Sequence, residues 1–278
     1  MIPPAGGDAT EVSEGAAAAS AVRVLLVVPT LGRRLQTLER TLASVTSQAG
    51  VAVDVRLVCP APSPEVQALA ARFGAGMIAE AGHISAAVNR GWADAGRAHR
   101  YVAWLGDDDV LRDGALSRSV QALEAQPRAV VAFGHCDYID EDAALLFTRR
   151  PPAGASWLLQ FVPGLIKQET CLFRRDAVVR VGGLDEQLRY AMDLDLLLRL
   201  RRLGPFARVD TSQAGFCWHA DSITIANREA SLDEAQGIQQ RLARGLSAIG
   251  FRLVRPVFRW LILLASSRIN KTTHGARA

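Results

Sequence analysis

The chain has 278 residues, and its apolar fraction of 49% is enough to build one large α/β domain or two small ones. Its formal charge of +4 comes from arginine, because lysine occurs only at Lys167 and Lys271. The body of the chain has no dense basic stripe with interleaved aromatic residues, which argues against binding of nucleic acid. The four cysteines are widely spaced and form no Cys-x-x-Cys pair, which argues against a zinc site and favours a reducing compartment.

Residues 1–20 are rich in Ala, Gly, Glu and Pro, and they predict a disordered leader without the apolar run of a signal peptide. The longest apolar run near the C-terminus, residues 261–265, is far shorter than the ~20 residues that a spanning helix needs. The sequence therefore predicts a cytoplasmic protein, either free in solution or held at the inner face of the membrane.

Strands and helices are predicted to alternate from residue 22 to residue 133. Continuous apolar or β-rich runs predict strands at 22–28, 51–58, 77–79, 101–105 and 129–133. Helical spacing and a Ser-Pro-Glu start signal predict helices at 35–45, 63–73, 86–95 and 113–125. This alternation implies an α/β fold with a mostly parallel sheet, helices on both faces, and ligands beyond the carboxyl ends of the strands.

After Pro151 and Pro152 the pattern becomes mixed α+β, with helices expected at 176–181 and from 193, and a strand near 207–210. We expect one domain at 21–226, made of a donor half (21–135) and an acceptor half (136–226), followed by a helical, basic tail at 227–278. Arginines and aromatic residues alternate in the tail between 251 and 268. This face either packs on the domain or rests on an anionic membrane as a peripheral contact.

Two acidic clusters carry most of the functional information. Asp107, Asp108 and Asp109 follow directly after the predicted strand at 101–105, and Asp193 and Asp195 lie where a helix is expected to begin. Three successive carboxylates repel one another if they are buried without a counter-charge. A hard divalent cation can hold them together and can in turn bind a diphosphate. Together, a metal site and a positioned base predict chemistry on a phosphorylated substrate.

Five motifs follow one another along the chain. They are the strand end Val27-Val28-Pro29-Thr30, the Ser-x-x-x-Gln segment Ser44–Gln48, the segment Gly82–Gly91, the acidic segment Gly106–Asp109, and Gly183–Leu188 followed by Asp193 and Leu198-Arg199-Leu200. In this order they resemble the motifs of family 2 inverting glycosyltransferases with the Rossmann-like GT-A fold, and the resemblance extends over residues 22–224.

The resemblance implies that a sugar–nucleotide donor lies across the strand ends and that a hydroxyl acceptor, such as a cell-envelope or lipid-linked glycan, attacks it. It makes Asp193 the base, with Asp195 as a rival. The implied cofactor is Mg²⁺ or Mn²⁺, held by Asp108 with Asp109, and with His219 as a metal or phosphate ligand. The implied donor contacts are Pro29, Thr30, Arg33, Ser85, Asn89, Asp107 and Asp108.

The sequence departs from the family pattern at two places. An Asp-Asp-Gly-Ser segment usually ends the second strand and contacts the nucleotide, whereas this chain has Cys59-Pro60-Ala61-Pro62-Ser63. Gly106 occupies the first acidic position of the metal motif. Two other classes of protein therefore remain as alternatives: a nucleotidyltransferase, and a non-catalytic relative that binds nucleotide or glycan. Arg90 as a phosphate contact and Lys167–Thr170 as an acceptor-side loop are further hypotheses beside an ordinary structural role.

Overall fold

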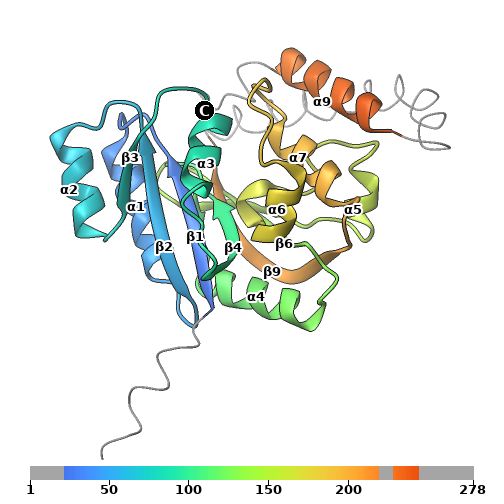
Figure 1. The fold of residues 1–278 in the computed structure, drawn as a ribbon, viewed down its shortest axis with the longest axis horizontal. Helices are drawn as coiled ribbons and strands as arrows, with labels where there is room; N and C mark the ends of the chain where they lie inside the picture. Colours follow the sequence, from blue (N-terminus) through green and yellow to red (C-terminus); the bar gives the residue numbers. More distant parts are fainter. Residues whose placement is uncertain (1–21, 219–227, 244–278) are drawn as a thin grey trace, which may run out of the picture.

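The computed structural model describes residues 22–218 and 228–243, which form a mixed sheet with helices on both faces (Figure 1). The order of its strands is β3-β2-β1-β4-β8-β6-β9-β5, and β7 pairs with β6. The strands are β1 (Arg23–Pro29), β2 (Ala52–Cys59), β3 (Gly76–Ala79), β4 (His99–Trp104), β5 (Val110–Leu111), β6 (Val131–Ile139), β7 (Leu145–Arg149), β8 (Leu172–Arg174) and β9 (Phe206–Cys217).

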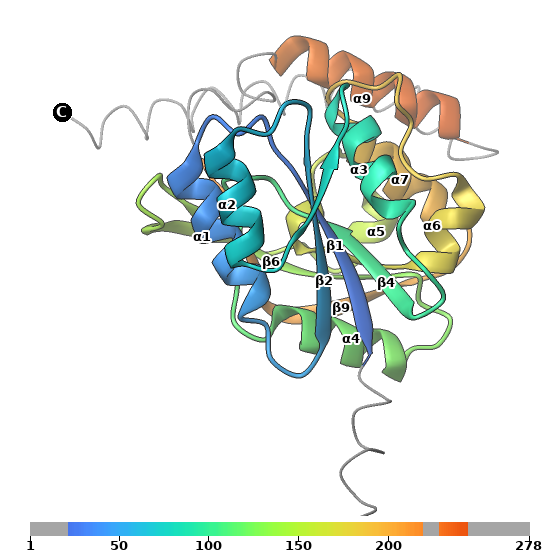
Figure 2. The same ribbon diagram turned by 60° about the vertical axis from the view of Figure 1, so that its left-hand side comes forward.

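The helices lie in two layers against this sheet. Figure 2 shows α1, α2 and α4 away from α3, α6 and α7, with the strands between them. Their bounds are α1 (Leu35–Thr46), α2 (Pro64–Arg72), α3 (Ile84–Trp92), α4 (Ala115–Ala125), α5 (Ala155–Leu158), the 3₁₀ turn η2 (Gln168–Thr170), α6 (Arg175–Val181), α7 (Met192–Leu200) and α9 (Arg228–Leu242).

Strand β1 is buried on both faces, as its unbroken apolar sequence predicts. Val24, Leu26 and Val28 pack in the core that α1, α2 and α4 share. Leu25 and Val27 belong to the opposite core, with α3, α6 and α7. Alternate side chains of a strand point to opposite faces, so this central strand contributes to both cores. Its two neighbours, β2 and β4, run parallel to it.

Helix α3 packs unusually close to β1. A methyl group placed on Gly91 would come within 2.6 Å of the side chain of Val27. The close contact between helix and strand therefore requires glycine at position 91, although glycine has a lower helix propensity than most residues. This contact fixes α3 beside the carboxyl end of β1, where the acidic segment also lies.

The second half differs from its prediction in the extent of its strands. The predicted strands at 129–133 and 207–210 are the first parts of β6 and β9, which pair in parallel from Val131 and Phe206 to Ile139 and Cys217. The apolar pattern did not reveal their full length, because polar residues such as His135 and Asp137 interrupt it. The sequence also missed β5, β7 and β8, which are two to five residues long.

The described part of the predicted tail is α9, which packs on α7. Ala235 and Ile238 of α9 are buried in the same core as most of α7, and Leu232 is also buried. Within residues 22–218 and 228–243, none of the helices has the length and apolar character that crossing a bilayer requires. The predicted leader, His219 and the arginine-rich part of the tail lie outside the described residues.

Candidate active site

The carboxyl ends of β1 and β4 bring Thr30 and Asp107 together. The Thr30 hydroxyl donates a hydrogen bond of 2.6 Å to Asp107 Oδ2, and it accepts one of 2.9 Å from the Gly32 amide. The backbone of Thr30 is held in turn by Val58 of β2. Burial raises the pKa of Asp107, and the bond from Thr30 opposes this rise. Two residues that are 77 positions apart thus form one polar edge, as expected for neighbouring parallel strands.

The guanidinium of Arg34 lies against the next carboxylate. Arg34 Nη2 is 2.9 Å from Asp108 Oδ2 and 3.6 Å from Asp107 Oδ1. The sequence had favoured Arg33, which is exposed. Neighbouring residues in an irregular segment point in directions that sequence spacing does not specify, so Arg34 was missed.

Gly106 is required by the way in which the acidic segment turns. A methyl group there would lie 2.8 Å from Asp109 Oδ2 and 3.1 Å from Asp108 Oδ1. The segment folds its own carboxylates over this glycine, leaving no room for a larger side chain at this position. The departure from the resembled motif therefore has a local packing reason.

Asp109 is buried, with 4% of its surface exposed, and it holds β9 against the acidic segment. Its Oδ1 accepts a hydrogen bond of 2.9 Å from the Cys217 amide, and its carbonyl accepts one from the Thr41 hydroxyl. Burial raises the pKa of Asp109 well above its ordinary value, and the nearby charges of Glu169 and Asp108 raise it further. These contacts give Asp109 a structural role, and its role as a metal ligand stays a prediction.

The Ser-x-x-x-Gln segment at the end of α1 bonds to the backbone that follows the acidic segment. Ser44 Oγ accepts a hydrogen bond from the Leu111 amide. Gln48 accepts one from the Leu116 amide and donates one to the Arg112 carbonyl. These bonds anchor β5 and the start of α4, which directly follow the acidic segment. The motif therefore holds the backbone that follows the acidic segment, a role that sequence spacing alone did not reveal.

Asp193 lies in the first turn of α7, half-buried. Burial raises its pKa, while a hydrogen bond from the Leu194 amide and the positive charge of Lys167 oppose that rise. A carboxylate with a raised pKa is a better proton acceptor near neutral pH than an exposed aspartate. Asp193 lies at a helix start, as the sequence predicted, and its role as the base stays a prediction.

Its rival Asp195 points to a different side of α7 and is 1% exposed. Arg199 donates to one of its oxygens at 2.6 Å, and Arg241 of α9 contacts the other at 2.7 Å. Both oxygens are occupied by arginines, so Asp195 is an internal counter-ion. This arrangement favours Asp193 as the base.

Lys167 and Glu169 form a charged pair on the acceptor side. Lys167 Nζ is 3.5 Å from Glu169 Oε1 and lies 3.9 Å from the centre of the Phe216 ring. Burial lowers the pKa of this lysine, but Glu169, Tyr138, Cys136 and Asp193 together outweigh burial and leave the pKa above its usual value. The second oxygen of Glu169 is buried and has no hydrogen-bond partner. The pair places one fixed cation close to Asp193.

The remaining predicted site residues have other surroundings. The side-chain amide of Asn89 is hydrogen-bonded within the protein: it donates to the Leu184 carbonyl and to Glu186, and it accepts from the Leu184 amide. Ser85 is completely buried and its hydroxyl has no hydrogen-bond partner. Arg90 is paired with Asp94 and lies 3.9 Å from Glu80. Pro29 ends β1 beside Thr30.

The position of the missing nucleotide-binding aspartate is filled by Cys59, which is 1% exposed. Its Sγ lies close to the Gly32 turn, and the Ser63 hydroxyl caps α2 by accepting a hydrogen bond from the Val66 amide. The end of β2 therefore presents a buried thiol and a capping hydroxyl where the resembled motif has a carboxylate.

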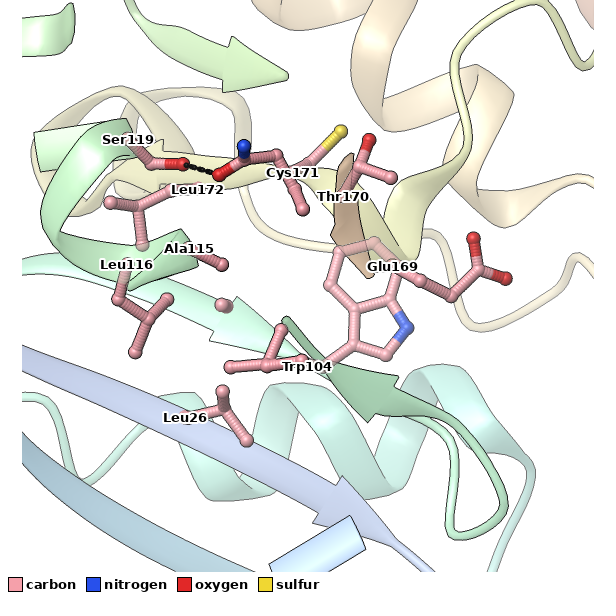
Figure 3. Close-up of a pocket in the computed structure, with 12 residues that line it drawn as sticks. Leu26, Trp104, Ala115, Leu116, Ser119, Glu169, Thr170, Cys171 and Leu172 are labelled. Carbon is pink, nitrogen blue, oxygen red and sulfur yellow. Dashed lines mark hydrogen bonds between the residues drawn. The ribbon is translucent and has the colours of Figure 1, made fainter. Parts of the chain in front are cut away.

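One internal cavity lies beneath the acidic segment, between β1, β4, α4 and β8 (Figure 3). Leu26, Leu116 and Leu172 line it, and Ser119 bonds to Gln213 at its rim. It has space for about 10 Å³ of water-sized volume, which is enough for a single water molecule and too small for a sugar. In Figure 3 the carboxylate of Glu169 points away from this cavity. The cavity is therefore a packing defect and has no role in substrate binding.

The described residues fit a divalent cation at Asp107 and Asp108 only in part. Carboxylate oxygens are the ligands that Mg²⁺ and Mn²⁺ prefer, and a cationic guanidinium already lies against these two groups. No set of three acidic, His or Cys side chains converges on one point within residues 22–218 and 228–243. A cation here would take ligands from Asp108 and from the substrate's phosphates, as Mg²⁺ sites commonly do.

This fold, with its acidic edge at the carboxyl ends of β1 and β4, defines the class of the protein: it is the GT-A fold of nucleotide-sugar transferases. A family model described as "Glycosyl transferase family 2" matches residues 25–177, more than half of the chain. The chain therefore belongs to glycosyl transferase family 2. The match covers Thr30, Arg34 and the acidic segment, and it ends before Asp193.

Solved structures of two glycosyltransferases share the fold. The mannosyltransferase PcManGT from Pyrobaculum calidifontis, in complex with GDP-Man and Mn²⁺, has a TM-score of 0.62 and 16% identity, over 82% of this chain and 66% of that one. TarS from S. aureus, in complex with UDP-GlcNAc, has a TM-score of 0.60 and 11% identity, over 78% and 65%. The chain thus spans about two thirds of the length of these chains. No curated protein matches the sequence significantly.

Proposed function

We propose that the protein is a metal-dependent, inverting glycosyltransferase that moves a hexose from a nucleoside-diphosphate sugar to a hydroxyl group of an acceptor. The observation that carries this proposal is the polar edge formed by Thr30, Asp107 and Asp108, with Arg34 against its carboxylates. It lies where open α/β sheets bind ligands, beyond the carboxyl ends of neighbouring strands. Membership of family 2 supports the same reaction.

Asp108 would hold the divalent cation together with the donor's diphosphate. When bound, Mg²⁺ or Mn²⁺ neutralises the charge that develops on the leaving nucleoside diphosphate. Asp107, held by the Thr30 hydroxyl, would accept a hydrogen bond from the ribose. Arg34 would turn from Asp108 to the diphosphate, so that the same guanidinium serves the empty and the loaded site. The complexes of PcManGT with GDP-Man and Mn²⁺ and of TarS with UDP-GlcNAc support a donor of this class.

Asp193 would take the proton from the acceptor hydroxyl while that oxygen attacks the anomeric carbon from the side opposite the leaving group. Attack from the opposite face inverts the configuration at that carbon. Lys167 keeps a positive charge close to the base and thereby favours its ionised, proton-accepting form. Phe216, under the Lys167 ammonium, is then one wall of the acceptor site.

We further propose that the acceptor is a cell-envelope or lipid-linked glycan, met at the cytoplasmic face of the membrane. The hairpin of β6 and β7 exposes Leu145, Leu146 and Phe147 to 60%, 46% and 42%. Phe147 stacks on Tyr138, whose ring is also in contact with Phe216, so this apolar surface continues to the acceptor side of the site. All four cysteines are unpaired, which agrees with a reducing compartment.

The test compares Asp193→Asn with Asp195→Asn and the wild type. Asp193→Asn should keep donor affinity within about twofold and lose turnover by about 10²–10⁴-fold, the usual contribution of a general base. Asp195→Asn should instead lower stability, by about 3 kcal/mol, because it removes the buried charge that Arg199 and Arg241 share and turns an amide donor toward one of them. Equal loss of donor binding and turnover in Asp193→Asn would contradict its role as the base.

A further inference from the structure

Helix α9 holds the start of α7, the helix that carries Asp193. The carboxylate of Glu234 accepts three hydrogen bonds from successive backbone amides at this point. Its Oε1 accepts from Tyr190 at 2.8 Å and from Ala191 at 2.7 Å, and its Oε2 accepts from Arg189 at 3.0 Å. Both oxygens of one side chain therefore fix the three residues that lead into the helix.

Helix α7 has no side-chain cap of its own. Its N-cap residue is Ala191, which has no side-chain acceptor, and no side chain at that position caps the helix. The three amides that Glu234 accepts belong to the N-cap residue and the two residues before it, and a carboxylate is a strong acceptor for them. Glu234 thus holds the entry to α7 from a helix more than 40 residues further along the chain.

Helix α9 is firmly attached to the domain, so its carboxylate has a defined position. Gln239 is completely buried and exchanges hydrogen bonds with the segment after α5: Gln160 donates to the Gln239 carbonyl, and Gln239 donates to the Leu159 carbonyl. Arg241 adds a second tie to α7 through Asp195 at 2.7 Å. Helix α9 therefore contacts α7 at its backbone start and at an internal side chain.

We propose that Glu234 is a positioning residue that sets the start of α7 and, through it, the place of the Asp193 carboxylate. This inference rests on the proposed function, in which Asp193 is the base. Asp193 follows Ala191 by two residues and accepts a hydrogen bond from the Leu194 amide, so its place depends on where the first turn begins. A base displaced by about 1 Å loses about a hundredfold in rate. Neither residue is covered by the family match, which ends at residue 177.

The test compares Glu234→Gln and Glu234→Ala with Glu229→Gln and Glu229→Ala. Glu229 is an exposed residue in the first turn of the same helix, so its variants remove the same charge or side chain without touching α7. Glu234→Gln keeps an oxygen for Tyr190 and Ala191 but turns an amide donor toward the Arg189 amide. We expect kcat to fall about 10-fold in Glu234→Gln and about 100-fold in Glu234→Ala, with KM for the donor within about twofold.

Hydrogen exchange gives a readout that does not depend on activity. The amides of residues 189–191 should exchange faster in Glu234→Gln than in Glu229→Gln, while those of β1 and β4 stay unchanged. The inference is overturned if kcat of both Glu234 variants equals that of the Glu229 variants, or if kcat and donor affinity fall together as in general destabilisation. Should Asp193→Asn retain full turnover, the proposed function fails instead, whatever the Glu234 variants do.

Discussion

Replacing Thr30 with valine removes the hydroxyl that joins the ends of β1 and β4 and keeps the shape of the side chain. Thr30 is 6% exposed, and its bond to Asp107 is 2.6 Å long. A hydrogen bond to a charged group is worth about 1.5–3 kcal/mol, and the Gly32 amide also loses its acceptor. We therefore expect Thr30→Val to lose about 2–4 kcal/mol of unfolding free energy at pH 7.

For a chain of this size the loss corresponds to a fall in Tm of about 4–8 °C, at roughly 2 °C per kcal/mol. Thr30→Ser is the matched control, because it keeps the hydroxyl and loses one methyl group, worth about 1 kcal/mol. Both variants are unfolded thermally in the presence of EDTA, so that no metal ion contributes. A Tm of Thr30→Val equal to that of the wild type, or above that of Thr30→Ser, would refute the reasoning.

The same variants have a defined pH dependence. Burial raises the folded-state pKa of Asp107 above its ordinary value of 3.8, so its ionisation opposes folding, and stability is lost as pH rises through the raised pKa. The Thr30 hydroxyl reduces this loss because it stabilises the ionised form. The difference between Thr30→Val and Thr30→Ser should therefore be largest at pH 7–8 and should shrink toward pH 4. A difference that does not change with pH would separate Thr30 from the ionisation of Asp107.

Two further predictions concern the acidic segment. Gly106→Ala places a methyl group 2.8 Å from an oxygen of Asp109, so it should lower the free energy of unfolding by about 1–3 kcal/mol and weaken donor binding, both measured by calorimetry. Gly96→Ala is the control: its added group meets nothing within 4 Å, and it should change neither quantity. Asp109→Asn keeps an acceptor for the Cys217 amide and removes a carboxyl group whose pKa burial raises well above 3.8. Since the wild type loses stability as pH rises through that raised pKa, Asp109→Asn should have the higher Tm at pH 8 and no advantage near pH 4, and equal Tm values at pH 8 would contradict this account.

The sequence predicted the edge of the sheet at which the site lies, because strand ends can be located from apolar runs and their polar successors. Thr30 and Asp107 each follow such a run, and parallel pairing of β1 with β4 then makes them neighbours. Asp193 was predicted at a helix start from the residue pattern, and it lies in the first turn of α7. Its role as the base was predicted from the resemblance to the family motif and stays a prediction.

Other parts of the site have no signal in the sequence. The side chain of Arg34, and not that of Arg33, lies against Asp108. Its direction is set by the irregular residues before α1. The partnership of Glu234 with the start of α7 joins segments more than 40 residues apart through backbone amides, which carry no residue-specific pattern. Short strands such as β5 form because longer neighbours offer free edges, and two residues show no periodicity.

The most direct test of the proposed function is the phosphorus-containing product that the enzyme releases. The wild type would be incubated with UDP-, dTDP- and GDP-sugars, Mn²⁺ and an extract of lipid-linked glycans, and the products followed by ³¹P NMR. The account predicts free nucleoside diphosphate from one of these donors, formed by the wild type and lost in both Asp108→Ala and Asp193→Asn. Release of pyrophosphate, or nucleotide binding without any release, would contradict it and favour a nucleotidyltransferase or a binding protein.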